Sequence, residues 1–167
     1  MAADHVLARR TVTFDELRRA ALPFRGGQGY AGLTRSFAFA SGRSASVGES
    51  VARVVFAEQR LPAPVLGEPL VHRGELLGVV DFVWPAYATV AEFDGRLKYT
   101  GSDSERDDRL WREKQREDRI REAGYEVVRL TWEQVTSAPR EVAQRVRAAF
   151  ARALARGSGS AAGRYGA

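Results

Sequence analysis

Three acidic residues interrupt two otherwise apolar segments within residues 79–99 (VVDFVWPAYATVAEFDGRLKY). Both segments are rich in valine, alanine and aromatic residues, which predicts two antiparallel strands joined by a tight turn. Because side chains alternate along a strand, Asp81, Glu92 and Asp94 are expected on one face of the sheet. Carboxylates this close repel one another unless a cation neutralises them, and hard oxygen ligands suit Mg²⁺ or Mn²⁺. The alternative is a polar face of the sheet turned to solvent.

The register of this hairpin depends on its turn. If residues 85–86 (Pro-Ala) form a two-residue turn, Asp81 faces Val90, and Glu92 becomes its diagonal cross-strand neighbour. The opposite face is then apolar and suited to packing under a helix. Its members are Val80, Phe82, Trp84, Ala91 and Phe93.

Two further residues could complete such a site. Lys98 follows Asp94 by four residues, and its ammonium could stabilise an attacking hydroxide or the charge of a phosphorane. Glu49 could close the carboxylate cluster from the first turn of a helix. It also stands three residues after Ser46, at the spacing of a capping box, so a purely structural role is an equal alternative.

The cations of this chain are unevenly distributed. The 167 residues include 26 Lys and Arg against 21 Asp and Glu, a net charge of +5, and 24 of the cations are arginine. Residues 1–47 carry seven basic and three acidic residues, whereas residues 48–95 carry three basic and seven acidic residues. This pattern is typical of a metal-binding acidic centre framed by phosphate-binding ends. The two lysines are Lys98 and Lys114.

Several other kinds of site are excluded or disfavoured. The chain has no cysteine, which rules out disulfides, thiol nucleophiles and thiolate metal sites. Gly27, Gly29 and Gly32 match a dinucleotide-binding glycine pattern, but a predicted helix precedes them where that fold requires a strand. The only histidines, His5 and His72, have neither metal-ligand nor triad spacing.

The elements that would position the candidate site form an α/β pattern. Capping signals, apolar periodicity and proline or glycine stops predict helices over 13–22, 33–40, 47–60, 104–123 and 139–155. Strands are predicted over 66–72, 76–84, 87–94 and 126–130. We expect an N-terminal helical appendage (1–45), a main domain (46–156) and a flexible tail (157–167). The main domain should contain a mixed sheet of four or slightly more strands, with a central antiparallel hairpin flanked by helices.

These residues resemble a known nuclease family. Asp81, ten intervening residues and then Glu92-Phe93-Asp94 are similar to the PD-(D/E)XK nuclease signature, with Glu49 in the place of the helix glutamate of that fold. More narrowly, ES at 49–50, VDFVWP at 80–85, EFDGRLKY at 92–99 and EKQREDRIREAGYEVVRLTW at 113–132 resemble the very-short-patch-repair-type endonuclease-like domain. This domain occurs at the C-terminus of actinobacterial proteins described as AbiEi-type antitoxins. The resemblance spans about residues 46–152.

The resemblance implies a restriction-endonuclease-like core. Asp81, Glu92 and the main-chain carbonyl of Phe93 would be the metal ligands. Asp94 occupies the position where the superfamily has a lysine, so the lysine role would pass to Lys98. Lys98 in turn occupies the place of a histidine found in related domains.

Further cations could contact nucleic acid near this site. The candidates are Arg96, Lys114 and Arg116. For Lys114 the alternative is a solvated helix face paired with Asp118 four residues later.

Two functions follow as hypotheses. The first is a metal-dependent DNA endonuclease, used in DNA repair or phage defence, with Mg²⁺ or Mn²⁺ as cofactor. The second is a catalytically silent nuclease-fold module that binds DNA or regulates, of the AbiEi-antitoxin type. DNA is the expected partner, together with a homodimer and a cognate toxin or defence protein. With no apolar run long enough for a membrane span and no signal peptide, we expect a cytoplasmic protein without a membrane partner.

Overall fold

The computed structural model describes residues 2–94 and 103–157 and divides the chain into two compact units, up to Ser50 and from Val51 onward. The division falls inside helix α4 (Val47–Glu58), a little beyond the boundary after residue 45 that the sequence suggests. Of the predicted tail, 157–167, the structure describes only Gly157.

The first unit is helical. Its elements before α4 are α1 (Ala2–Ala8), α2 (Phe14–Ala21), the 3₁₀ turn η1 (Leu22–Phe24) and α3 (Tyr30–Phe39). The predicted capping box at α2 is confirmed, because the Thr13 hydroxyl accepts the Glu16 N–H at 3.2 Å and the Glu16 carboxylate accepts the Thr13 N–H at 2.7 Å. Helix α1 was not expected from the sequence.

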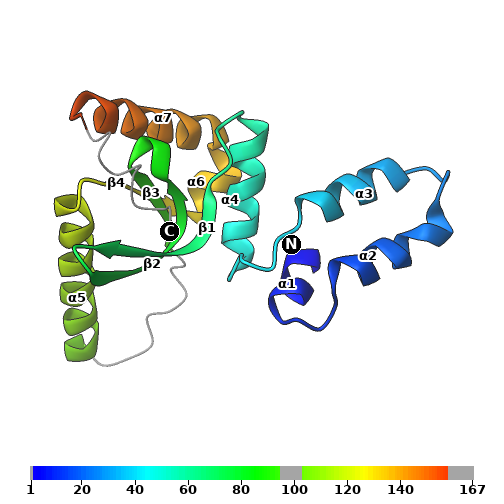
Figure 1. Cartoon of the computed structure of the whole chain (residues 1–167), viewed down its shortest axis with the longest axis horizontal. Helices are drawn as coiled ribbons and strands as arrows, with labels where there is room; N and C mark the ends of the chain where they lie inside the picture. Colours follow the sequence, from blue (N-terminus) through cyan, green and yellow to red (C-terminus); the bar gives the residue numbers. More distant parts are fainter. Residues whose placement is uncertain (1, 95–102, 158–167) are drawn as a thin grey trace. The chain divides into compact units, whose positions relative to one another are not determined.

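The second unit is an α/β domain (Figure 1). After α4 its elements are β1 (Val65–His72), β2 (Glu75–Trp84), η2 (Pro85–Tyr87), β3 (Thr89–Asp94), α5 (Asp103–Glu122), β4 (Glu126–Thr131), α6 (Trp132–Ser137) and α7 (Pro139–Ala155). The sheet order is β1-β2-β3-β4, with β1–β2 and β2–β3 antiparallel and β3–β4 parallel. The predicted α/β class and mixed four-stranded sheet are therefore confirmed. Helix α6 is an addition.

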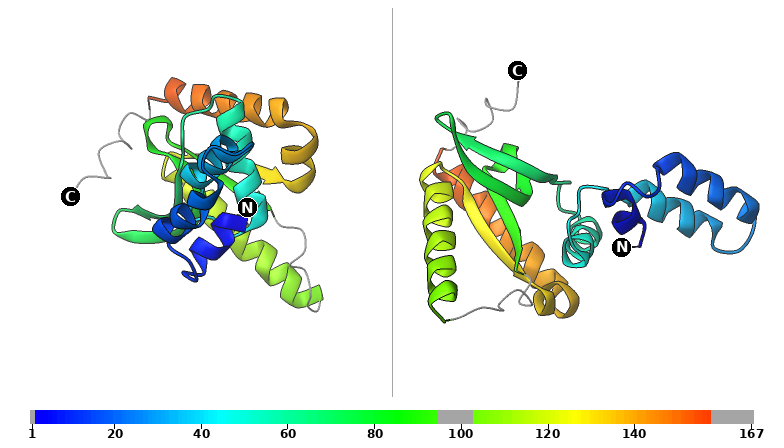
Figure 2. Two further views of the ribbon diagram at one scale, coloured as in Figure 1. Left: turned by 90° about the vertical axis from the view of Figure 1, so that its right-hand side faces the viewer. Right: turned by 90° about the horizontal axis from the view of Figure 1, so that it is seen from below.

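Helices cover both faces of the sheet (Figures 1 and 2). Helix α5 lies along one face and packs Ile120 and Ala123 against side chains of the strands. The second half of α4, together with α6 and α7, packs on the other face around an aromatic cluster. In that cluster the Trp84 ring lies 5.2 Å from Phe56 and 5.3 Å from Phe150, edge-on to both. The sheet is thus the middle layer of three.

The connection between β2 and β3 differs from the predicted turn. It comprises η2 and Ala88, four residues instead of two, and Trp84 pairs with Thr89 instead of Tyr87. Proline begins the 3₁₀ turn and Ala88 closes it in a left-handed conformation, at φ 40°. The register therefore shifts by two residues. A shift of two by itself preserves which face each side chain occupies in a regularly alternating strand.

One member of the predicted apolar face lies on the other side of the sheet. Val80 packs in the cluster beneath α5, whereas Phe82, Trp84 and Ala91 pack beneath α4 and α7. Val83 also packs beneath α5, so strict alternation is broken between Val80 and Val83. This is the stretch of β2 that contains Asp81.

Helix α5 ends in a glycine cap. Gly124 follows α5 at φ 93°, as its predicted C-terminal role requires, and Tyr125 donates its N–H back to the Ile120 carbonyl at 3.3 Å.

Within the described residues, no helix is both long and apolar enough to cross a membrane.

Candidate active site

The candidate site lies where the pairing of β2 and β3 ends. The ladder covers three residue pairs and stops at Phe82–Ala91, while β3 stays paired with β4 as far as Asp94. One residue beyond the last pair, Asp81 places its carboxylate against β3. Its Oδ2 accepts the Phe93 backbone N–H at 2.7 Å. The Asp81 side chain thus accepts the hydrogen bond that a backbone carbonyl of β2 would accept in a continued ladder. Its carboxylate therefore lies at Phe93, the residue next to Glu92.

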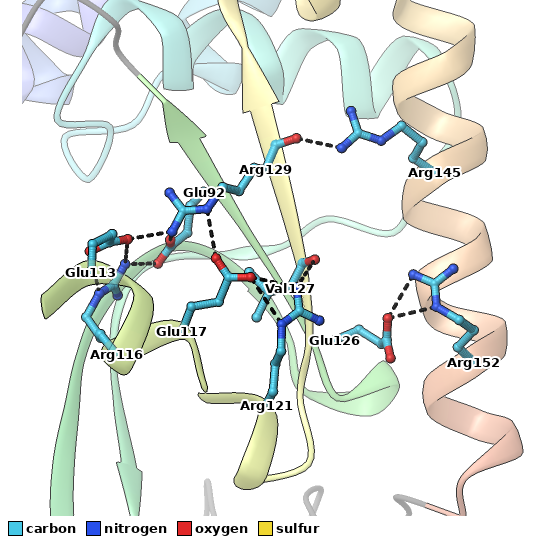
Figure 3. A network of polar contacts seen from close by, with 10 residues as sticks. All are labelled: Glu92, Glu113, Arg116, Glu117, Arg121, Glu126, Val127, Arg129, Arg145 and Arg152. Atoms are coloured by element: carbon cyan, nitrogen blue, oxygen red, sulfur yellow. Dashed lines mark hydrogen bonds and ion pairs between the residues drawn. The ribbon is translucent and has the colours of Figure 1, made fainter. Parts of the chain in front are cut away.

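Glu92 is buried and faces two guanidinium groups (Figure 3). Its residue exposure is 7%, and its Oε1 lies 2.6 Å from Arg116 Nη2 of α5. Its Oε2 lies 3.8 Å from Arg129 Nη2 of β4, which is an ion pair without hydrogen-bond geometry. In the parallel register, Arg129 is the residue directly beside Glu92.

The network continues along α5 (Figure 3). Glu113 accepts from both Arg116, at 2.8 Å, and Arg129, at 2.7 Å. Glu117 accepts from Arg129 at 2.9 Å and from Arg121 at 2.7 Å. Three carboxylates and three guanidinium groups therefore alternate across β3, β4 and α5. This arrangement neutralises charge that the fold buries.

Burial and ion pairing act in opposite directions on these carboxylates. Burial raises the pKa of Glu92, and the nearby Arg116 and Arg129 offset that effect only in part. Hydrogen bonds from Arg116 and Arg129, together with their charge, lower the pKa of Glu113 to about 2 against partial burial. Glu92 is thus the carboxylate of the network whose negative charge is least compensated. Additional positive charge beside it would be favourable.

The donor chemistry at this junction fits a hard divalent cation. Asp81 and Glu92 offer carboxylate oxygens from adjacent strands, and the Phe93 carbonyl belongs to the same segment of β3. Among the described residues, no group of three or more His, Cys, Asp or Glu side chains is placed to hold a metal ion. Any site here consequently relies on two carboxylates and a main-chain oxygen. One of those carboxylates is also paired with Arg116.

Comparison with known proteins gives two relatives. The chain is 30% identical over 131 residues to the uncharacterized proteins MT2308 and Rv2248 of Mycobacterium tuberculosis, from strains CDC 1551 / Oshkosh and ATCC 25618 / H37Rv. The match covers 78% of this chain and 46% of each relative, so the chain spans less than half the length of the curated proteins it matches. No family model matches the chain, and no solved structure matches it significantly.

Glu49 lies in the first unit, in the first turn of α4. It is buried, with 7% of the residue exposed, and its carboxylate accepts the Ala45 N–H at 2.7 Å and the Ser46 hydroxyl at 2.8 Å. The Ser46 hydroxyl accepts the Glu49 N–H at 3.2 Å. The predicted capping interaction is therefore present. A catalytic role for Glu49 stays a prediction.

The remaining catalytic candidates lie at or beyond the end of β3. Asp94 is half-buried at the last residue of the strand, in register with Thr131. Lys98 and Arg96 fall outside the described residues, so their roles stay predictions.

The two helix cations predicted to contact DNA differ in their surroundings. Lys114 is exposed on α5 and, within the described parts of the chain, makes no ion pair with Asp118. Arg116 is 21% exposed along its side chain and is held between Glu92 and Glu113. Lys114 is thus available to an external anion, whereas Arg116 already has internal partners.

Sequence reasoning missed Arg129 as a member of the site. The signal was present, because Arg129 interrupts the apolar strand Glu126–Thr131 just as Glu92 interrupts β3. What could not be seen is that β3 and β4 pair in parallel with these two residues side by side.

Proposed function

We propose that this chain is a metal-dependent DNA endonuclease-like protein that hydrolyses phosphodiester bonds, with Mg²⁺ or Mn²⁺ as its cofactor. The observation that carries the proposal is the junction of β2 and β3. There Asp81, whose Oδ2 lies 2.7 Å from the Phe93 nitrogen, and the buried Glu92 supply one carboxylate from each of two adjacent strands. The order α4-β1-β2-β3-α5-β4, with β3 and β4 parallel, is compatible with a restriction-endonuclease-like core.

In this proposal Asp81, Glu92 and the Phe93 carbonyl would hold the cation. A bound Mg²⁺ or Mn²⁺ would supply a Lewis acid for the phosphate and a source of activated water. Asp94 would add negative charge at the end of β3. Lys98 would provide an ammonium close to the developing charge on the phosphate.

Substrate binding would rest on cations outside the ion-pair network. Exposed Lys114, together with Arg96, would contact the phosphate backbone, and such contacts weaken as salt concentration rises. A homodimer would supply the two sites needed to cut both strands. A cognate toxin or defence partner and a cytoplasmic location belong to the same proposal.

One observation favours a second candidate, a catalytically silent module with a DNA-binding or regulatory role. Arg116 and Arg129 already place positive charge at Glu92, at 2.6 and 3.8 Å. In a silent protein these guanidinium groups would replace the metal permanently. The fold would then keep its carboxylates for stability and its exposed cations for DNA.

A cleavage assay separates the two candidates. Supercoiled and mismatched DNA are incubated with the protein in Mg²⁺, in Mn²⁺ or in EDTA, and DNA binding is measured in parallel at several salt concentrations. The endonuclease proposal predicts metal-dependent nicking that Glu92→Gln abolishes and that the exposed Glu133→Gln leaves unchanged. Retained salt-sensitive binding without cleavage under any of these conditions would establish the silent module instead.

A further inference from the structure

The Arg116 side chain extends from α5 to Glu92 and lies against Gly78 of β2. Gly78, at φ 136°, leaves room for this side chain, because a Cβ built there would lie 3.2 Å from Arg116 Cδ and 3.4 Å from its Nη1. A residue with a Cβ at this position would therefore require the Arg116 side chain to shift by a few tenths of an ångström. Within the described residues, the Arg116 guanidinium is also the only group hydrogen-bonded to the Glu92 carboxylate.

Arg116 is held by a second carboxylate as well. Its Nε donates to Glu113 Oε2 at 3.0 Å, and its Nη2 is shared between Glu113 Oε1, at 2.8 Å, and Glu92 Oε1. Glu113 and Arg116 are one turn apart on the same helix, so this pair does not depend on the sheet. The guanidinium can therefore leave Glu92 and keep its helix partner.

We propose that Arg116 is an internal counter-ion that competes with the divalent cation for the Glu92 carboxylate. The inference rests on the proposed function and deepens it by naming a residue that controls metal loading. A guanidinium 2.6 Å from Glu92 Oε1 and a metal ion on the same carboxylate repel each other, and this repulsion grows as their separation falls. Metal binding then requires the Arg116 guanidinium to move away from Glu92 Oε1 while it stays bonded to Glu113.

The proposal makes Arg116 a positioning residue and not a catalytic one. It predicts that the charge of Arg116 weakens the binding of a divalent cation to the metal-free protein, relative to a variant that lacks this charge. Removing that charge should strengthen cation binding even when no DNA is present. A residue that acted only by contacting DNA would not change metal affinity in the absence of DNA.

The test measures the binding of Mn²⁺ to the full chain in the absence of DNA. Binding is monitored by calorimetry and by the electron paramagnetic resonance signal of free Mn²⁺. Arg116→Gln is expected to bind Mn²⁺ about tenfold more tightly or better than wild type, the scale on which one neighbouring charge changes the ionic state of a carboxylate. The matched control is Arg121→Gln, on the same helix, because Arg121 pairs with Glu117 and not with Glu92. Arg121→Gln should bind Mn²⁺ with the wild-type affinity.

Two outcomes overturn the inference in different ways. Equal Mn²⁺ affinity of wild type and Arg116→Gln would show that Arg116 does not compete with the cation, and would leave the proposed metal-dependent function unaffected. Absence of Mn²⁺ binding in every variant removes both.

A measurement on the wild-type protein covers the case in which Arg116→Gln does not fold. Mg²⁺ is titrated while the Nε–H resonances of the arginine side chains are followed by NMR. The Arg116 resonance should move as the cation binds, and that of Arg121 should stay fixed. Mg²⁺ binding that leaves the Arg116 resonance unmoved would contradict the proposal.

Discussion

Glu49 offers a direct way to separate a structural carboxylate from a catalytic one. Its carboxylate accepts hydrogen bonds from Ala45 and Ser46, and a capping box accepts glutamine as well as glutamate at this position. We expect Glu49→Gln to stay within about 0.5 kcal/mol of wild-type stability and Glu49→Ala to lose about 1 kcal/mol or more, measured by urea unfolding. Cleavage by Glu49→Gln at the wild-type rate would assign the residue to the cap alone. Loss of cleavage at unchanged stability would instead assign it to catalysis.

The ion-pair network predicts an acid-sensitive contribution to stability. The pKa of Glu113 falls from 4.5 to about 2 in the folded protein, so the unfolded chain binds this proton first as pH decreases. The contribution of Glu113 is therefore complete above about pH 4.5 and is lost as pH falls toward 2. In Glu113→Gln the free energy of unfolding should therefore decrease less steeply with falling pH over this range than in wild type. Urea titrations at a series of pH values measure this dependence.

Glu92→Gln is the control with the opposite sign. Burial raises the pKa of Glu92, so the folded protein gains this proton before the unfolded chain, and protonation favours folding as pH falls. Removing the group should make the acid loss of stability steeper. If Glu113→Gln and Glu92→Gln changed the slope in the same direction, the assignment of the two carboxylates would be wrong.

At the scale of elements, the aromatic side chain of Phe150 links α7 to the end of β2 and to the turn that follows it. Phe150 stacks on Tyr87 at 4.1 Å and meets Trp84 edge-on at 5.3 Å. Phe150→Ala should cost about 3–5 kcal/mol, because it leaves a cavity between the helix and the sheet. Leu154→Ala, at a residue that is 58% exposed, should cost less than about 0.5 kcal/mol. Thermal or urea unfolding measures both, and comparable losses would contradict this packing.

Leu154 also shows where sequence periodicity loses accuracy. Val142, Val146, Phe150 and Leu154 recur every fourth residue, which predicts one continuous apolar face. Four residues advance an α-helix by about 40° more than one turn, so the fourth member lies about 120° from the first. The structure accordingly buries Val142, Val146 and Phe150 and replaces Leu154 with Ala153 at the interface.

The elements themselves were largely predictable and the contacts between them were not. Apolar runs and caps placed the four strands and α7 close to their observed bounds. The turn at Pro85 was misjudged by two residues, because a 3₁₀ turn followed by a left-handed alanine leaves no glycine signal. The prediction that Asp81 and Glu92 share a face rests on strand alternation alone, and alternation is broken in the stretch of β2 that contains Asp81. The ion pairs with Arg116 and Arg129 depend on how α5 and β4 pack, which local sequence does not specify.

At the scale of the whole molecule, the two units differ in how much apolar surface they bury. Among the described residues up to Ser50, the buried hydrophobic side chains are Leu7 and Ala21 alone. Phe14 and Phe24 in the same unit remain 41% and 63% exposed. The second unit buries two clusters, one on each face of its sheet. Since apolar burial is the main stabilising contribution, the first unit should open at a lower free energy than the second.

Amide hydrogen exchange of the full chain tests this difference. Backbone amides of α2 and α3 should exchange through local opening, well before global unfolding, whereas those of β3 and of the buried face of α7 should exchange only near the global free energy of unfolding. The comparison is made at two pH values, so that a rate change due to intrinsic exchange is separated from a change in opening. Protection of α2 and α3 equal to that of β3 would mean that the two units unfold as one. In that case Phe150→Ala should lower the protection of both units, whereas independent units confine its effect to the second.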